Sequence, residues 1–352
     1  MNLPSILATA FVALMLSALP QLARAEVQAL IFPEVSTFSN RAPAIGESRS
    51  GSELSASMFA SGTHGQFTWL AEYFKSKDES EMERAQIGWR FSDRDVVWLG
   101  RMHTPLGFWN TEFHHGTYLQ MSHHRPVIDD FEDAGSPLPK HFIGAMWEGS
   151  RVIGGGGAIR YSLAWGQQPR WGGTAFEPKD ILGRVKLGPH RNGGGARIAF
   201  RPDEVNTDEI GVSAHQFTAL GDGQPVEKIE QFALALHAIK SIGPLKLSTT
   251  LSSARNTVYS GTPRSGRFTS MWVQGEYGLT AKLTAFARVE RTFRAQSDPL
   301  LRLMPSFRQR QDVLGLRWDL LTNQALRIEL LDGREAARPV REIELGWSAV
   351  FP

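Results

Sequence analysis

The feature that most constrains this chain is an alternation of apolar and polar residues with period two. In the segment REIELGWSAVF, Ile343, Leu345 and Trp347 share one face, whereas Glu342 and Glu344 fall on the opposite face. Successive side chains of a β-strand point to opposite sides of the sheet. The segment is therefore predicted to form a strand with one apolar face and one charged face.

Similar segments of about ten residues recur throughout residues 26–352, separated by short turns rich in Gly, Asp, Asn, Ser and Pro. That is the length of a tilted transmembrane strand. Beyond residue 25, no apolar run approaches the roughly 18 residues that a membrane helix needs. We therefore predict an all-β chain that forms a transmembrane antiparallel β-barrel of about sixteen strands.

Two stacked β-sandwiches would also alternate, so other features must decide. The polar faces carry Arg and Glu on nearly every segment, more than a solvated sheet face needs. Many apolar faces also end in an aromatic residue, which is typical of the girdle at a membrane interface. The girdle candidates are Trp89, Trp98, Trp165, Tyr277, Trp318 and Trp347. Because unpaired backbone groups are costly in hydrocarbon, such a sheet must close, and about sixteen strands leave a water-filled lumen.

Residues 1–25 have the character of a signal peptide. An apolar run from Ile6 to Leu19 is followed by Ala23-Arg24-Ala25, a small-x-small pattern that predicts cleavage near Ala25. No shift in composition divides the rest, so residues 26–352 are expected to form one barrel domain. The formal net charge of +2 and the absence of cysteine indicate neither a nucleic-acid-binding protein nor a disulfide framework.

Three features of the chain resemble Gram-negative outer-membrane porins: a signal peptide before alternating strands, the ending GWSAVF, and the segment VVWLGRMHTPLGFWN. The last is similar to phosphate-selective and related specific porins, whose chain leaves the barrel wall at a pattern that is Gly100, Pro105 and Gly107 here. The resemblance implies an outer-membrane location, contact with lipid, insertion by the barrel assembly machinery, and passive diffusion of small hydrophilic solutes. It also implies a homotrimer as a candidate assembly, and no cofactor.

Residues 104–140 interrupt the alternation. Loops of this length are normally functional or disordered, and the aromatic content of this one argues against disorder. We predict that Pro105 and Gly107 turn the chain out of the wall and that the loop folds into the lumen as a constriction. The alternative is a loop that packs over the mouth of the barrel.

Histidines and carboxylates crowd this loop. The pore candidates within it are His114, His115, His123, His124, Asp129, Asp130, Glu132 and Asp133. Adjacent residues on an extended chain point in opposite directions, no HExxH spacing is present and no cysteine is available. We therefore predict no specific metal site, although a borderline one could be assembled. The favoured roles are hydrogen bonds between loop and wall, and a pore charge that changes between about pH 5 and 8.

Arginines on the polar strand faces complete the set of pore candidates: Arg90, Arg101, Arg160, Arg288, Arg317 and Arg327. Facing the loop carboxylates across the lumen, they would create a transverse field, and their fixed charge would favour anions. The alternative is pairing of Arg with Glu within the wall, which would stiffen the barrel without selecting ions. Both interpretations remain open from sequence.

The predicted function is thus a porin-like channel with a preference for anions. A structural barrel that serves as a scaffold within a larger assembly is the main alternative. An outer-membrane enzyme is disfavoured because the sequence has no Gly-x-Ser-x-Gly elbow and its histidines concentrate in a loop, so no catalytic residues are predicted.

Overall fold

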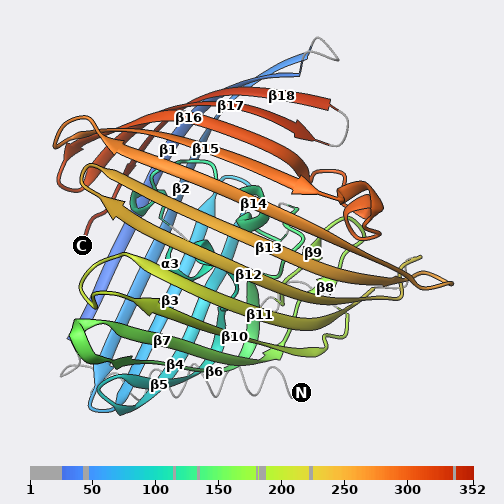
Figure 1. The fold of residues 1–352 in the computed structure, drawn as a ribbon, viewed down its shortest axis with the longest axis horizontal. Helices are drawn as coiled ribbons and strands as arrows, with labels where there is room; N and C mark the ends of the chain where they lie inside the picture. The colour runs from blue at the N-terminus through green and yellow to red at the C-terminus, as the bar shows by residue number, and fades with distance from the viewer. Residues whose placement is uncertain are drawn as a thin grey trace.

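A computed structural model describes residues 26–42, 47–113, 116–132, 135–179, 181, 188–221, 225–335 and 338–352. Within these ranges, sixteen long strands form the wall of a barrel (Figure 1). They are β1 (Glu26–Ala42), β2 (Glu47–His64), β3 (Phe67–Ser76), β4 (Ser80–Ser92), β5 (Asp95–His103), β6 (His141–Val152), β7 (Ala158–Gln167), β10 (Asn192–Arg201), β11 (Glu209–Leu220), β12 (Lys228–Ile242), β13 (Leu245–Tyr259), β14 (Arg264–Gly278), β15 (Leu283–Phe293), β16 (Arg308–Leu321), β17 (Gln324–Glu335) and β18 (Arg338–Ala349). The signal peptide predicted at residues 1–25 lies outside the described residues.

The sheet closes because the first and last strands pair. Each wall strand is antiparallel to its neighbours, and β1 pairs with both β2 and β18. The seam between β1 and β18 runs from Glu34 opposite Ser348 to Arg41 opposite Arg341. The predicted antiparallel barrel of about sixteen strands is confirmed. Among the described residues, no helix is long and apolar enough to span a bilayer.

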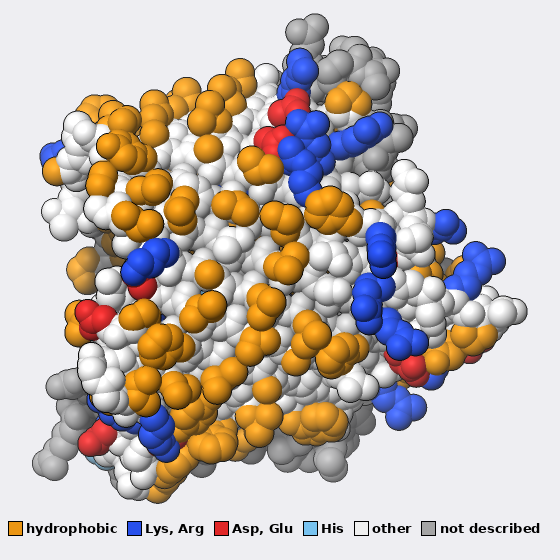
Figure 2. Space-filling model, viewed as in Figure 1, with side chains coloured by type: hydrophobic (Ala, Val, Ile, Leu, Met, Phe, Trp, Pro, Cys, Tyr) orange, Lys and Arg blue, Asp and Glu red, His pale blue; other side chains and the backbone are white. Residues whose placement is uncertain are grey.

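The two faces of the wall differ in the way that the alternation predicts. On β12, Phe232, Leu234 and Leu236 point outward and are exposed, whereas Ala233 and Ala235 point inward and are buried. Figure 2 shows apolar side chains spread over the outer surface, with Lys and Arg concentrated toward the right of that view. The outer face therefore suits hydrocarbon, and small inward residues leave room inside the barrel.

The aromatic girdle is only partly as predicted. Trp89, Trp165, Tyr277 and Trp318 are exposed on the outer surface. Trp98 is not, because Leu99 takes the outward position on β5 and Trp98 packs against Met102, Phe142 and Ala164. Its Nε1 donates to Glu148 at 2.8 Å, which satisfies the indole inside the barrel.

The connections differ strongly between the two ends of the barrel. Tight turns such as those at Gly65 and Gly243, both with positive φ, join strands at the end where the C-terminus lies. At the other end lie the long connections. They hold α3 (Trp109–Glu112), η1 (Thr117–Leu119) and η2 (Val127–Asp129) between β5 and β6, the small sheet of β8 (Arg170–Trp171) and β9 (Phe176–Glu177) after β7, and η4 (Ala295–Ser297) and η5 (Leu301–Leu303) before β16. A further short helix, η3 (Gly154–Gly156), lies between β6 and β7.

The outward apolar face generates a first prediction. We expect Leu234→Arg, near the middle of β12, to destabilise the barrel in lipid vesicles by about 2–4 kcal/mol, because a charge is placed at the bilayer midplane. Denaturant unfolding from vesicles measures the loss. Val205→Arg is the matched control, since Val205 is 93% exposed in the turn after β10. Equal stability of the two variants would contradict the assignment of the outer face to lipid.

Candidate functional site

In the segment between β5 and β6, the described residues 104–113, 116–132 and 135–140 cross the inside of the barrel. Its Gly107 N–H donates to Ser213 Oγ on β11 at 3.0 Å, and its Val127 N–H donates to Glu290 on β15 at 2.6 Å. Tyr118 Oη donates to the carbonyl of Thr322, beyond β16, at 2.5 Å. These partners lie far around the wall from β5 and β6, and in Figure 1 the segment that carries α3 lies within the barrel outline.

The exit of this loop from the wall depends on the residues singled out by the sequence. Gly100 has a φ of 137°, and a Cβ there would lie 2.1 Å from the backbone oxygen of Ala85. Gly107 has a φ of 75°, a left-handed conformation that favours glycine. Pro105, between these two glycines in the sequence, is buried. Gly100 still pairs with Gly144 of β6, and β5 continues to His103, so of the two glycines only Gly107 lies in the loop itself.

Three wall arginines hold the backbone of the loop. Arg317 donates to the carbonyls of Tyr118 and Gln120 at 2.8 and 2.6 Å. Arg327 donates to the carbonyls of Thr117, Gln120 and Met121 at 2.5, 2.7 and 3.1 Å.

Arg288, almost fully buried, bonds to the carbonyls of His124 and Arg125 at 2.8 and 3.0 Å. The carbonyls of an irregular loop lack the partners that a helix or sheet provides. Each hydrogen bond from a charged donor to such a carbonyl contributes about 1.5–3 kcal/mol to stability. These arginines thus anchor the loop, and they do so through its backbone.

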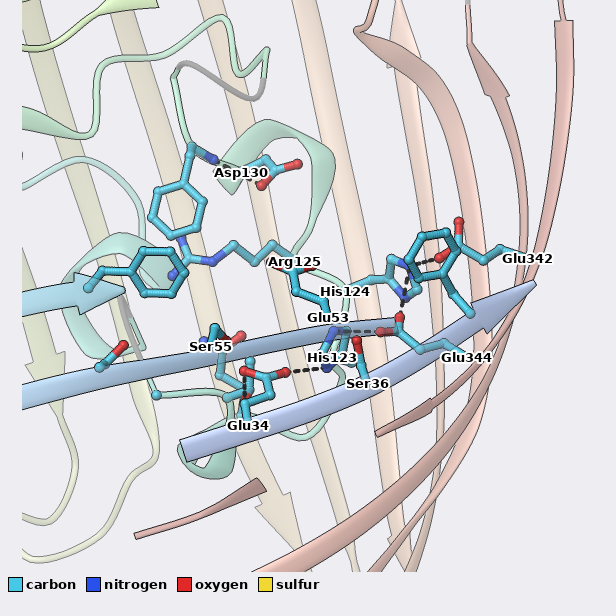
Figure 3. A pocket seen from close by; sticks show the side chains of 17 residues that line it. Glu34, Ser36, Glu53, Ser55, His123, His124, Arg125, Asp130, Glu342 and Glu344 are labelled. Atoms are coloured by element: carbon cyan, nitrogen blue, oxygen red, sulfur yellow. Dashed lines mark hydrogen bonds and ion pairs between the residues drawn. The ribbon is translucent and has the colours of Figure 1, made fainter. Parts of the chain in front are cut away.

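The loop histidines pair with glutamates of the wall. His123 Nδ1 lies 2.7 Å from Glu34 on β1, and its Nε2 lies 2.6 Å from Glu344 on β18 (Figure 3). His124 Nδ1 lies 3.0 Å from Glu329 on β17, and its Nε2 lies 3.2 Å from Glu342. Residues 121–124 form bends, so the two imidazoles reach one cluster of carboxylates although they are adjacent in sequence.

Both imidazoles are held in the charged form. Burial disfavours the imidazolium of His123, but the charge of Glu34 and hydrogen bonds to Glu34 and Glu344 outweigh burial and raise its pKa well above the usual value. For His124, burial likewise opposes the charge, yet hydrogen bonds to Glu329 and Glu342 raise its pKa to about 9. At neutral pH the loop therefore presents cations to an anionic stretch of wall.

An apolar cluster fixes residues from both halves of the loop. Trp109 packs edge-on against Trp272 of β14 at 5.7 Å between ring centroids, within a buried group that includes Leu106, Ile128 and Leu138. Trp272 Nε1 donates to Asp129 at 2.9 Å. The inward alanines of β12 and β13 belong to the same cluster, so small wall residues accommodate the loop.

The remaining sequence-predicted residues fall into three groups, of which the first is buried. Asp129 and Glu132 are buried, Asp129 3.5 Å from Lys140 Nζ and Glu132 3.0 Å from His141 Nδ1. Arg101 is also buried, donating to the carbonyls of Glu83 and Lys179 at 3.0 and 2.8 Å.

Arg90, Arg160 and Asp130, in contrast, line cavities. Arg160 also contacts the loop, 2.7 Å from Glu112. His114, His115 and Asp133 lie outside the described residues.

Polar cavities remain beside the loop and near the turns. One of about 450 Å³ lies between the loop and β1, β2 and β18, lined by Glu34, Glu53, His123, His124, Arg125, Asp130, Glu342 and Glu344 among others (Figure 3). A second of about 320 Å³ shares His124, Arg125 and Asp130 with it. A third of about 550 Å³ lies near the turns, lined by Arg90, Arg94, Arg160 and Arg197 together with Asp93, Asp95, Glu148 and Glu204.

Sequence reasoning did not identify the wall glutamates that receive the histidines: Glu34, Glu329, Glu342 and Glu344. The alternation did place Glu342 and Glu344 on the polar face of the last strand, opposite Ile343 and Leu345. That pattern was a usable signal for an inward carboxylate pair. It contained no information on which loop residue would meet the pair.

The chain is similar in fold to solved structures, although no protein-family model and no curated protein sequence matches it. The anion-selective porin from Comamonas acidovorans superimposes with a TM-score of 0.66 at 13% identity, over 93% of this chain and 100% of that one. The OmpF of Salmonella typhi, in complex with daunomycin, gives 0.61 at 9% identity, over 92% and 97%. The outer membrane channel DcaP of Acinetobacter baumannii gives 0.59 at 11% identity, over 94% and 98%. The chain therefore has the fold of the Gram-negative outer-membrane porins, a closed barrel of sixteen antiparallel strands.

Proposed function

We propose that the protein is an outer-membrane channel for passive diffusion of small hydrophilic solutes. The observation that carries the proposal is a closed barrel with an apolar outer face, crossed by a loop with polar cavities beside it and a further polar cavity near the turns. The apolar outer face suits the hydrocarbon core, and backbone pairing around the ring leaves no sheet edge to be solvated. The proposal includes the partners that the porin resemblance implies: membrane lipid, the barrel assembly machinery and a homotrimer.

Residues 104–140 form the constriction in this proposal. The loop is held by side chains from opposite parts of the wall, with Gly107 against β11 and His123 between β1 and β18. A segment held in this way narrows the lumen at a fixed position. Solutes then pass through the polar space beside His124, Arg125 and Asp130, which two of the cavities share.

The ion preference results from two opposing linings. The cavity beside the loop is rich in carboxylates, whereas the cavity near the turns holds four arginines and four carboxylates. A preference for anions, which the arginine content favours, depends on the arginines near the turns, because Arg288, Arg317 and Arg327 bind the loop backbone. One structural neighbour, the porin from Comamonas acidovorans, is anion-selective, which supports the same preference here.

A structural barrel that acts as a scaffold is the second candidate. It is favoured by the extent of the apolar cluster inside the barrel, which joins Trp109 and Ile128 of the loop to Phe217, Phe268 and Trp272 of the wall. Purified protein in a planar bilayer separates the two candidates, since a channel gives stepwise conductance. Folded, heat-modifiable protein without conductance would exclude the channel and favour the scaffold.

Removing the loop tests its role as the constriction. We expect deletion of Thr111 to Pro139 to raise single-channel conductance severalfold, because the deleted segment occupies the lumen. Electrophoretic heat-modifiability shows whether the shortened barrel still folds. An unchanged conductance in folded protein would mean that the loop does not limit the flow of ions.

Charge substitutions test the two linings separately. Glu53→Gln removes a carboxylate from the cavity beside the loop, and Arg90→Gln removes a cation from the cavity near the turns. We expect the first variant to shift the reversal potential in a salt gradient toward anions and the second to shift it toward cations. Both residues are exposed, so stability should change by less than about 0.5 kcal/mol. Shifts of the same sign would contradict the proposed pathway.

A further inference from the structure

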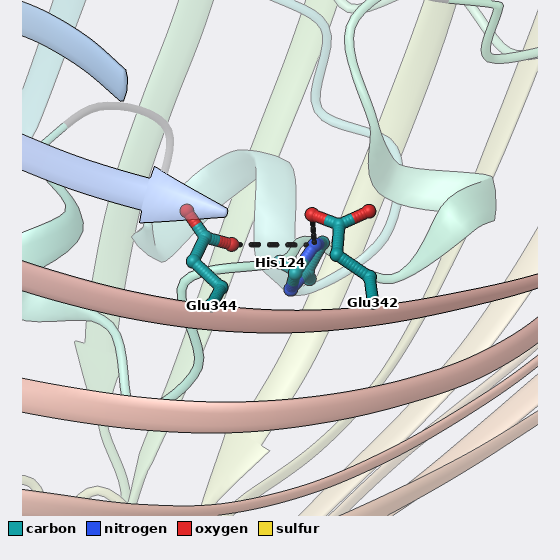
Figure 4. A group of neighbouring side chains, drawn as sticks. All are labelled: His124, Glu342 and Glu344. Atoms are coloured by element: carbon teal, nitrogen blue, oxygen red, sulfur yellow. Dashed lines mark hydrogen bonds and ion pairs between the residues drawn. The ribbon is translucent and has the colours of Figure 1, made fainter. Parts of the chain in front are cut away.

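The cluster around His124 has the geometry of a metal site that the sequence did not predict. His124 Nε2 lies 3.2 Å from Glu342 Oε1 and 3.4 Å from Glu344 Oε2, and the three ligand atoms all lie within 4.8 Å of one another (Figure 4). Zinc bonds of about 2.0–2.2 Å at tetrahedral angles place neighbouring ligand atoms about 3.4 Å apart. Two edges of the triangle therefore already match a tetrahedral site.

The ligand side chains are also held by hydrogen bonds through their other polar atoms, as the ligands of a bound metal usually are. His124 Nδ1 lies 3.0 Å from Glu329, which orients the ring so that Nε2 faces the two carboxylates (Figure 4). The other oxygen of Glu344 lies 2.6 Å from His123 Nε2, and His123 is held in turn by Glu34. A histidine ligand whose second nitrogen meets a carboxylate is the usual arrangement at zinc.

Charge also favours a cation at this place. Four carboxylates of the wall surround two imidazoles, and Arg327 is the guanidinium that interacts with both Glu34 and Glu329. Glu329 and Glu344 are 1% and 4% exposed, so their charges are little screened by solvent. A divalent ion between His124, Glu342 and Glu344 would be attracted by these carboxylates.

The site can be reached from solution. His124, Glu342 and Glu344 all line the cavity of about 450 Å³ beside the loop. Three protein ligands on the wall of a cavity leave a fourth position for water, as at zinc sites that remain open. An imidazole with two carboxylates suits zinc and similar transition metals, whereas calcium and magnesium prefer oxygen ligands alone.

We propose that His124, Glu342 and Glu344 bind a divalent transition-metal ion of the zinc class and so fasten the loop to β18. The ion replaces the Nε2 proton of His124, which is released to solvent, and lies between Nε2 and the two carboxylates. Glu329 and His123 are positioning residues. This site does not depend on conduction: a scaffold barrel with the same loop would bind the metal equally well.

Calorimetry on the folded, chelator-treated full barrel in detergent tests the site, with ZnCl₂ as the titrant. We expect one ion to bind per chain, and His124→Gln and Glu342→Gln each to weaken binding by at least a hundredfold. Glu329→Gln should weaken it about 10–100-fold, because it removes only the group that orients the imidazole. His64→Gln is the matched control, since His64 is exposed at the end of β2, and should leave binding unchanged.

Heat-modifiability on electrophoresis shows whether each glutamine variant folds. If one of them does not fold, the other variants still test the site. Glu342→Gln retains the size of the side chain and leaves the contacts of His123 in place. Absence of binding by the folded wild type up to about 1 mM zinc would overturn the proposal. So would equal affinity of the wild type, His124→Gln and Glu342→Gln, or tighter binding of calcium than of zinc.

Discussion

The pairing of β1 with β18 is the constraint on which the rest of this structure depends. A strand inside a bilayer has no water to satisfy its N–H and C=O groups, and each unsatisfied group costs several kcal/mol. The seam between Glu34–Ser348 and Arg41–Arg341 removes the two free edges at once. Once the ring closes, its circumference sets a lumen that wall side chains alone cannot fill. Residues 104–140 occupy part of that space.

Loop and wall are joined by complementary chemistry. Guanidinium groups of the wall bind backbone carbonyls of the loop, and carboxylates of the wall bind its imidazoles. Each contact removes a polar group from an unsatisfied state inside the barrel. Together with the apolar packing of Trp109 on Trp272, these contacts give the loop one position, although it contains little regular structure of its own.

The wall could be predicted from the sequence because its signal is local: each strand alternates by itself, as Ile343, Leu345 and Glu344 show. The wall residues that contact the loop could not be predicted in this way, because they depend on which strands face each other across the closed barrel. His124 meets Glu329 and Glu342 across 205 and 218 residues of chain. Arg317 and Arg327 donate to carbonyls of the loop, and the availability of those carbonyls depends on the path of an irregular segment. The prediction that Trp98 belongs to the outer girdle was wrong, because it was based on the aromatic side chain and not on the position of Trp98 in the alternation of β5.

The position of His123 links the two ends of the chain. Its imidazole joins Glu34 of the first strand to Glu344 of the last, on either side of the seam. β1 and β18 become neighbours only when the barrel closes. A sheet that has not closed therefore cannot hold His123 between Glu34 and Glu344. The contacts of His123 with both strands therefore require the closed seam, whereas the bonds from Arg288 and Arg317 to the loop do not. Separation of β1 from β18 would part His123 from one of its two glutamates and leave those other anchors in place.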